Sequence, residues 1–120
     1  MRLFNLKKTP EARGPFQSSA ISSQIASVVY ARCRVLSSES LQEKDAEKAN
    51  LASSLSRVAG YIAVGAIEIP QDGDSYDVVN AIELGIEQHN FRYPSEDIKI
   101  TNVTKTAEEV ARTVFSPAPL

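Results

Sequence analysis

The single cysteine of this 120-residue chain, Cys33, stands between two arginines, Arg32 and Arg34. Neighbouring cations favour the thiolate form of a cysteine, which is the nucleophilic form. A cysteine nucleophile also needs a base, and His89 is the only imidazole in the chain. No motif supplies a third group to orient that imidazole. We therefore predict that Cys33 and His89 do no chemistry and that Cys33 is a small apolar residue on the back of its helix.

A run of acidic residues that begins at Asp72 has part of the spacing of a calcium-binding loop. Counted from Asp72, acids occupy positions one, three and twelve, and the twelfth is Glu83. Such a loop requires glycine at position six and an oxygen ligand at position five, where this chain has Asp77 and Tyr76. We therefore predict no specific calcium site here, and expect these acids to stabilise the first turn of a helix.

No other pattern indicates a cofactor or a metal ion. One cysteine and one histidine are too few for a zinc site built on several thiolates. Glu83 and Glu87 share a helix face, but nothing in their spacing marks either as a buried acid or base. The chain also lacks a glycine-rich phosphate loop and a nucleophile elbow. We expect no catalytic residue, no cofactor and no bound metal.

Charge is distributed unevenly along the chain. A hydrophobic content of 42% at a net charge of −2 excludes a chain that is disordered throughout, and the length fits one domain. Residues 1–17 hold four basic residues and one acid, a net charge of +3, whereas residues 68–97 hold one arginine and eight acids, a net charge of −7. Such a dipolar chain suits contact between copies, or binding of the basic segment to an acidic partner.

We predict two groups of partner-binding residues. The first group combines charged and apolar side chains of the basic segment: Arg2, Leu3, Phe4, Leu6, Lys7, Lys8, Arg13 and Phe16. The second group consists of acids: Asp72, Asp74 and Asp77. Because Pro10, Gly14 and Pro15 argue against a regular helix, we expect residues 1–17 to form an extended anchoring arm.

Apolar periodicity predicts a mainly α domain over residues 18–115, a small bundle of about four helices with one short β-strand. The helices are expected at about residues 18–35, 40–67, 74–89 and 106–115, followed by a proline-containing tail at 116–120. The expected inward-facing residues recur every three or four positions: Ile21, Ile25, Val28, Val29, Leu51, Leu55, Val58, Ile62, Val78, Val79, Ile82, Ile86, Val110, Ala111, Val114 and Phe115.

Several local signals refine this outline. A turn is expected at Ser37 and Ser38, and the segments 40–43 and 106–109 each have the spacing of a capping box. Asp74 or Ser75 is expected to cap the third helix. Residues 61–64 suit either a helix or a strand, because β-branched residues are frequent in strands. Alternating apolar residues predict a strand at 97–103, which would need a partner strand in this chain or in another copy.

Residues 58–67 form the most apolar stretch, which is about half of what a bilayer requires. We therefore expect no membrane span. Because the start of the chain lacks the apolar stretch of a secretory signal, we expect synthesis in the cytoplasm, followed by incorporation into a particle or large complex. Sequence-specific nucleic-acid binding is not expected, since the acidic body would repel a duplex, and whether the basic arm touches nucleic acid stays open.

Taken together, these features favour a non-enzymatic structural or assembly subunit of a larger protein complex, held by ordered terminal arms that contact other copies or other subunits. Connector and shell-linking proteins of virus or phage particles have this architecture of a small body with reaching arms. The alternative is a small monomeric regulator or inhibitor that binds a basic or nucleic-acid-binding partner through its acidic surface. A small enzyme that uses Cys33 is a third alternative.

Overall fold

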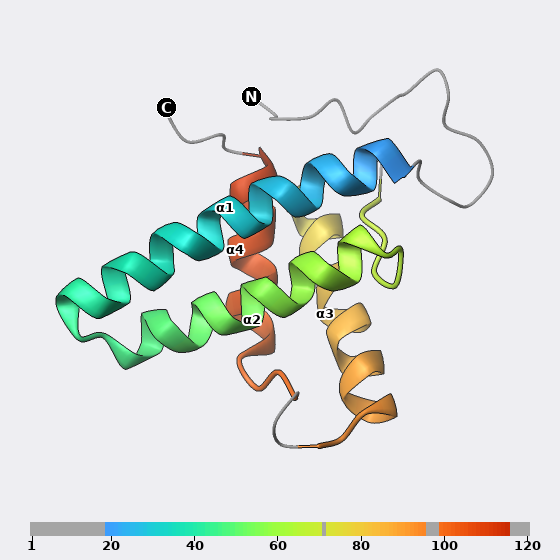
Figure 1. The fold of residues 1–120 in the computed structure, drawn as a ribbon. Coiled ribbons are helices and arrows are strands. Elements are labelled where there is room, and N and C mark those ends of the chain that lie inside the picture. Colours follow the sequence, from blue (N-terminus) through green and yellow to red (C-terminus); the bar gives the residue numbers. More distant parts are fainter. Residues whose placement is uncertain (1–18, 71, 96–98, 116–120) are drawn as a thin grey trace.

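The computed structural model describes residues 19–70, 72–95 and 99–115, which form four α-helices. α1 (Ser19–Glu43) and α2 (Ala46–Ala63) form a long antiparallel hairpin, and α3 (Ser75–Arg92) and α4 (Val103–Phe115) pack against each other (Figure 1). α4 also contacts both helices of the hairpin, so the four helices share one core. The predicted mainly helical fold is confirmed.

The core contains most of the residues whose spacing predicted burial. Those with no exposed surface come from all four helices: Ile25, Val29, Leu55, Val58, Ile62, Val78, Ile82, Ile86, Val110 and Val114. Ile21, Leu51, Val79 and Phe115 are partly buried and pack against this cluster. Cys33 does not lie on the back of α1 as predicted, because α1 continues past it and Cys33 and Leu36 extend the buried stripe.

The turn between α1 and α2 lies later than predicted. α1 continues through Ser37 to Glu43, and the Ser40 hydroxyl donates to the carbonyl of Ser37 (2.7 Å) instead of opening a helix. Lys44 adopts a left-handed φ of 54°, which reverses the chain. The carboxylate of Asp45 then accepts from the backbone amides of Glu47 and Lys48, so Asp45 is the residue that caps α2. The capping box predicted at residues 40–43 was wrong.

Residues 61–64, whose sequence suited either a helix or a strand, lie at the end of α2. Tyr61 to Ala63 are helical, and the helix stops there because Gly65 takes a left-handed φ of 81°. The amides of Ala66 and Ile67 both donate to the carbonyl of Tyr61, which turns the chain toward α3. Ile67 then packs on α3 at Gly85, where an added Cβ would lie 2.8 Å from the Ile67 Cγ1 atom.

The predicted strand at residues 97–103 was wrong for the part of it that the structure describes. Residues 99–102 are neither strand nor helix, and Val103 is already the first residue of α4. The side-chain amide of Asn90 donates to the carbonyl of Ile100 (2.6 Å) and accepts from its amide (2.9 Å). This side chain thus satisfies both backbone groups of Ile100 that a neighbouring strand would have paired.

The capping box predicted at residues 106–109 was also wrong. α4 begins three residues earlier, and the buried Thr106 hydroxyl donates to the side-chain oxygen of Asn102 (3.2 Å), which also accepts from the Ser54 hydroxyl (2.7 Å). Glu109 faces the core side of α4, where its buried carboxylate pairs with Arg32 of α1 (2.8 Å) and with Arg112. Glu109 therefore ties α4 to the hairpin.

The predicted basic arm and proline-containing tail, residues 1–17 and 116–120, lie outside the described residues. So do the eight partner-binding residues predicted in that arm. Across the part of the chain that the structure describes, no helix combines the length and the apolar character needed to cross a bilayer.

Candidate protein-interaction surface

The side of α3 that faces away from the core carries three large exposed apolar residues. Tyr76, Leu84 and Phe91 are 72%, 57% and 90% exposed. They are spaced eight and seven residues apart, which places them on one side of a helix, together with the exposed residues Asn80 and Glu87. We call these five residues the α3 outer face.

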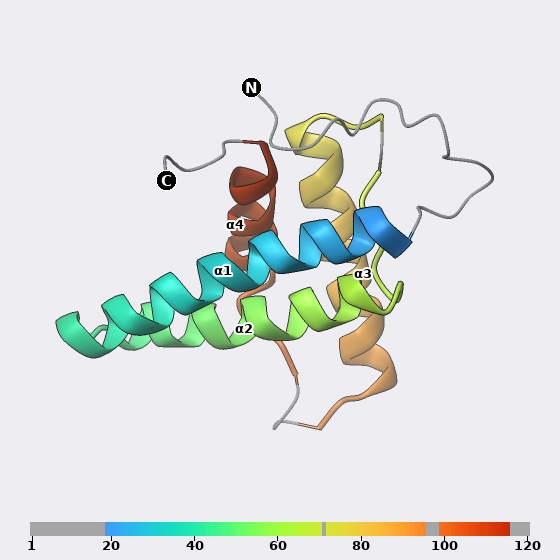
Figure 2. The same ribbon diagram turned by 45° about the horizontal axis from the view of Figure 1, so that its top comes forward.

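The opposite side of α3 anchors this helix in the core. Val78, Ile82 and Ile86 have no exposed surface, and Gly85 admits Ile67 at close range. In both views α3 lies beside the end of the hairpin where α1 begins and α2 ends (Figure 1 and Figure 2). Because the inner side is filled, the α3 outer face is available to another molecule without unfolding the domain.

Acidic residues gather at the start of α3. Asp74 caps the helix: its carboxylate accepts from the Asp77 amide (3.0 Å), and the Asp77 carboxylate accepts from the Asp74 amide (3.1 Å). This reciprocal pair confirms the predicted cap at Asp74 and uses the favourable position of acids at a helix N-terminus. Asp72, Asp74 and Asp77 are all exposed, so the three acids predicted to bind a partner lie at the end of α3 that carries Tyr76.

Further along α3, the charge remains acidic. Glu87 is exposed between Leu84 and Phe91, whereas Glu83 is partly buried and accepts a hydrogen bond from the Thr104 hydroxyl of α4 (2.9 Å). Arg92 supplies a cation only at the last residue of the helix. The surface around Tyr76, Leu84 and Phe91 therefore combines apolar area with negative charge.

Cys33 and His89 are not brought together. The Cys33 thiol lies between α1 and α2 and donates to the carbonyl of Ala52 (3.0 Å). Burial raises the pKa of this thiol above its ordinary value, against a smaller lowering by the backbone of Ser56. The His89 ring instead stacks on Tyr61, with ring centroids 4.0 Å apart, and lies 6.1 Å from the ring of Tyr93. The flanking arginines thus do not make Cys33 an activated thiolate.

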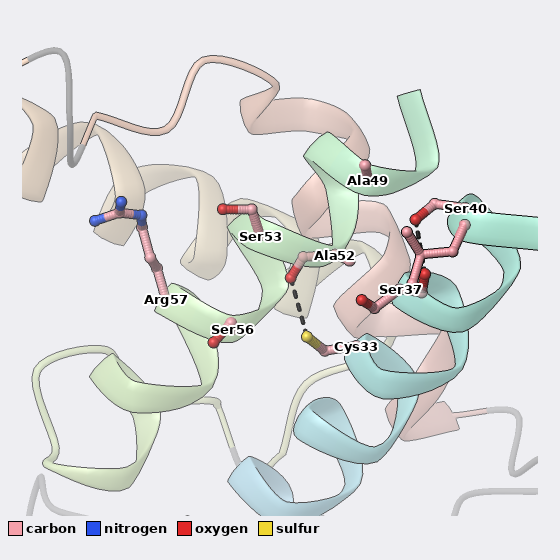
Figure 3. Close-up of a pocket in the computed structure, with 9 residues that line it drawn as sticks. Cys33, Ser37, Ser40, Ala49, Ala52, Ser53, Ser56 and Arg57 are labelled. Atoms are coloured by element: carbon pink, nitrogen blue, oxygen red, sulfur yellow. Dashed lines mark hydrogen bonds between the residues drawn. The ribbon is translucent and has the colours of Figure 1, made fainter. Parts of the chain in front are cut away.

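A pocket of about 580 Å³ opens beside Cys33, between α1 and α2 (Figure 3). Four serines line it together with one arginine: Ser37, Ser40, Ser53, Ser56 and Arg57. No histidine or carboxylate lies among its lining residues, so the pocket offers the thiol no general base. This pocket was not predicted from the sequence, although serines three residues apart on both helices (Ser37 and Ser40, Ser53 and Ser56) are a visible signal.

Metal-binding groups do not converge either. Among the described residues, no three side chains of histidine, cysteine, aspartate or glutamate lie close enough to hold a metal ion. Asp74, the third position of the calcium-like spacing, and Asp77, which stands where such a loop requires glycine, both turn their carboxylates toward backbone amides at the start of α3.

No family model matches the chain, and no curated protein or solved structure matches it either. The interpretation of the function therefore rests on the residues of this chain alone. Among the surfaces described above, the α3 outer face departs most from an ordinary solvated helix, because three large apolar side chains line up on it.

Proposed function

We propose that this chain is a non-enzymatic, protein-binding subunit of a larger assembly, of the kind that links neighbouring subunits in a virus or phage particle or another large complex. The observation that carries the proposal is the α3 outer face, on which Tyr76, Leu84 and Phe91 are exposed in a row. A helix of a monomeric domain normally turns polar side chains to water on such a side, so an apolar row favours a protein partner.

Energetics support this use of the surface. Full burial of a large apolar side chain is worth roughly 1.5–3 kcal/mol, so three such residues supply a substantial part of the free energy of a protein contact. Acids at the edge of the same surface would favour a basic partner and would raise the rate of association. Their contribution to the affinity would be smaller.

The basic segment 1–17 is the second part of the proposal. It carries Leu3, Phe4, Leu6 and Phe16 beside its cations. Fixing the backbone of a residue costs on the order of 1–2 kcal/mol, so an ordered arm of this length needs a large surface to cover. We propose that it acts as an anchoring arm in the assembled state. The expected strand pairing between copies no longer supports the proposal, because Asn90 satisfies the backbone of Ile100 within one chain.

A second candidate is a monomeric regulator that binds a basic protein. It is favoured by the exposed acids Asp72, Asp74, Asp77 and Glu87, which accompany the apolar row. The two candidates differ in self-association: an assembly subunit forms larger species by itself or with its neighbours, whereas a regulator stays a single chain until its basic partner is added.

Removal of the basic segment tests the proposal. A variant that begins at Ser18 keeps the four described helices and the core residues that they supply, so we expect it to retain its helical circular dichroism and a cooperative thermal transition. Its mass by light scattering should be that of one chain, while the full-length protein is larger. Assembly that persists unchanged without residues 1–17 would show that the segment is a passive tail.

A further inference from the structure

The α3 outer face and the basic segment 1–17 have complementary chemistry. The outer face presents Tyr76, Leu84 and Phe91 around Glu87, with Asp72, Asp74 and Asp77 at its beginning. The basic segment presents apolar residues next to cations in a short stretch: Leu3, Phe4, Leu6, Lys7 and Lys8. Each side therefore offers both an apolar part and a charge of opposite sign, which is the pattern of a specific protein contact.

The dimensions of the two parts agree. From Tyr76 to Phe91 the helix rises by about 22 Å, at 1.5 Å for each residue. An extended stretch of six residues spans about 20 Å, so residues 3–8 suffice to cover the row. Between this stretch and Ser19, the first residue of α1, ten further residues provide a reach of up to about 35 Å when extended. That reach is comparable to the body itself, whose extents are 44, 37 and 22 Å.

Two-fold symmetry allows two copies of this chain to exchange the basic segment. α1 begins at the end of the hairpin that lies beside α3 (Figure 2). In a dimer with two-fold symmetry, two such faces lie on either side of the axis, and each copy both gives and receives one segment.

We propose that the α3 outer face is the docking site for the basic segment, residues 1–17, of a second copy of this chain. This inference rests on the proposed function and adds to it which surface receives the arm. Leu3, Phe4 and Leu6, which span about 10 Å when extended, pack along Leu84 and Phe91, while Lys7 and Lys8 continue toward Tyr76 and the acids near the start of α3.

Charge reversal on the two sides of the contact tests this arrangement in the full-length chain. One variant, K7E/K8E, changes the net charge of the arm from +3 to −1, and a second, N80K/E87K, makes the outer face basic. A matched control, Q42K/E108K, changes the net charge by the same amount as the second variant, at exposed residues of α1 and α4. Mass is measured by sedimentation at low salt, and circular dichroism verifies the fold of each variant.

We expect self-association of K7E/K8E alone and of N80K/E87K alone to weaken by about tenfold, while the control assembles like the wild type. An equimolar mixture of the two weakened variants should recover the association, because each arm then meets a face of opposite charge. Recovery upon mixing requires contact between different chains, since an arm that docks on its own body gains nothing from a second variant.

Three outcomes would overturn the inference. If the mixture stays as weak as either variant, the arm docks on its own chain or elsewhere. If N80K/E87K associates like the wild type, the α3 outer face is not the receiving surface, although the chain remains an assembly subunit. If the wild-type chain stays a single chain at every concentration, the proposed self-assembly fails as well. The regulator interpretation then replaces it.

Discussion

The α1–α2 hairpin and α3 differ in what they expose to water. The exposed apolar residues of α1, Tyr30, Val35 and Leu41, are spaced five and six residues apart, so successive ones point to different sides of the helix. Those of α3 are spaced eight and seven residues apart and form one row. Isolated apolar residues on a surface are ordinary, whereas three large apolar side chains on one side of a helix, here separated by Asn80 and Glu87, favour a binding surface. We therefore propose that α3 binds a partner, whereas the hairpin serves the fold.

The largest expected effect distinguishes the two sides of α3 itself. Ile82 has no exposed surface, so Ile82→Ala should lower the free energy of unfolding by about 2–5 kcal/mol through lost burial and a cavity. Phe91 is almost fully exposed, so Phe91→Gln should change it by no more than about 0.5 kcal/mol. Urea denaturation followed by circular dichroism measures both. A loss of several kcal/mol in the Phe91 variant would mean that this side chain belongs to the core.

A smaller effect is expected where the hairpin is tied to α4. Glu109 is buried and pairs with Arg32 and Arg112, whose side chains are 37% and 62% exposed. Because water screens the two guanidinium groups, Glu109→Ala should cost about 1–3 kcal/mol of unfolding free energy, less than the loss of a fully buried pair. Glu109→Gln, which keeps the shape and the hydrogen-bonding oxygen, is the control and should cost less. Equal stability of the alanine variant and the wild type would show that the tie contributes nothing.

The smallest effect concerns the hairpin alone. Burial raises the pKa of the Cys33 thiol in the folded state, so the folded protein holds this proton more tightly than the unfolded chain does. The resulting stabilisation is complete below the ordinary thiol pKa and decreases as the pH rises through the raised value. Denaturation at pH 7 and at pH 10 should therefore show a larger loss of stability in the wild type than in Cys33→Ser. Parallel losses would contradict the assignment, and Cys33→Ser should assemble like the wild type at pH 7.

Spacing predicted the core of this fold because helix periodicity is imposed by backbone geometry. Val78, Ile82 and Ile86 follow one another at four-residue intervals, and all three are buried. Asp74 was predictable as a cap for the same local reason, since its partner Asp77 is only three residues away. Predictions that depend on residues within one helix turn were thus correct where no nearby residue competed for the same backbone groups.

Two predictions failed where a residue more distant in the sequence decided the outcome. The alternation around Ile100 suggested a strand, but Asn90, ten residues earlier, occupies its backbone groups. Glu109 has the spacing of a capping box with Thr106, yet Arg32 of α1 determines where its carboxylate lies. The α3 outer face was not predicted, because periodicity was used to identify buried residues, although the spacing of Tyr76, Leu84 and Phe91 already places them on one side of a helix.

The mass of the full-length variant L84Q/F91Q tests the central claim most directly. Glutamine is polar and tolerated in helices, so this variant removes the apolar row with little effect on the fold. The matched control, Y30Q/L41Q, removes two exposed apolar residues from α1. By sedimentation equilibrium, we predict that the wild type and the control form species larger than one 13.1 kDa chain, whereas L84Q/F91Q sediments as a single chain with unchanged helical content. Assembly of L84Q/F91Q at wild-type strength would contradict the assignment of α3 as the binding surface.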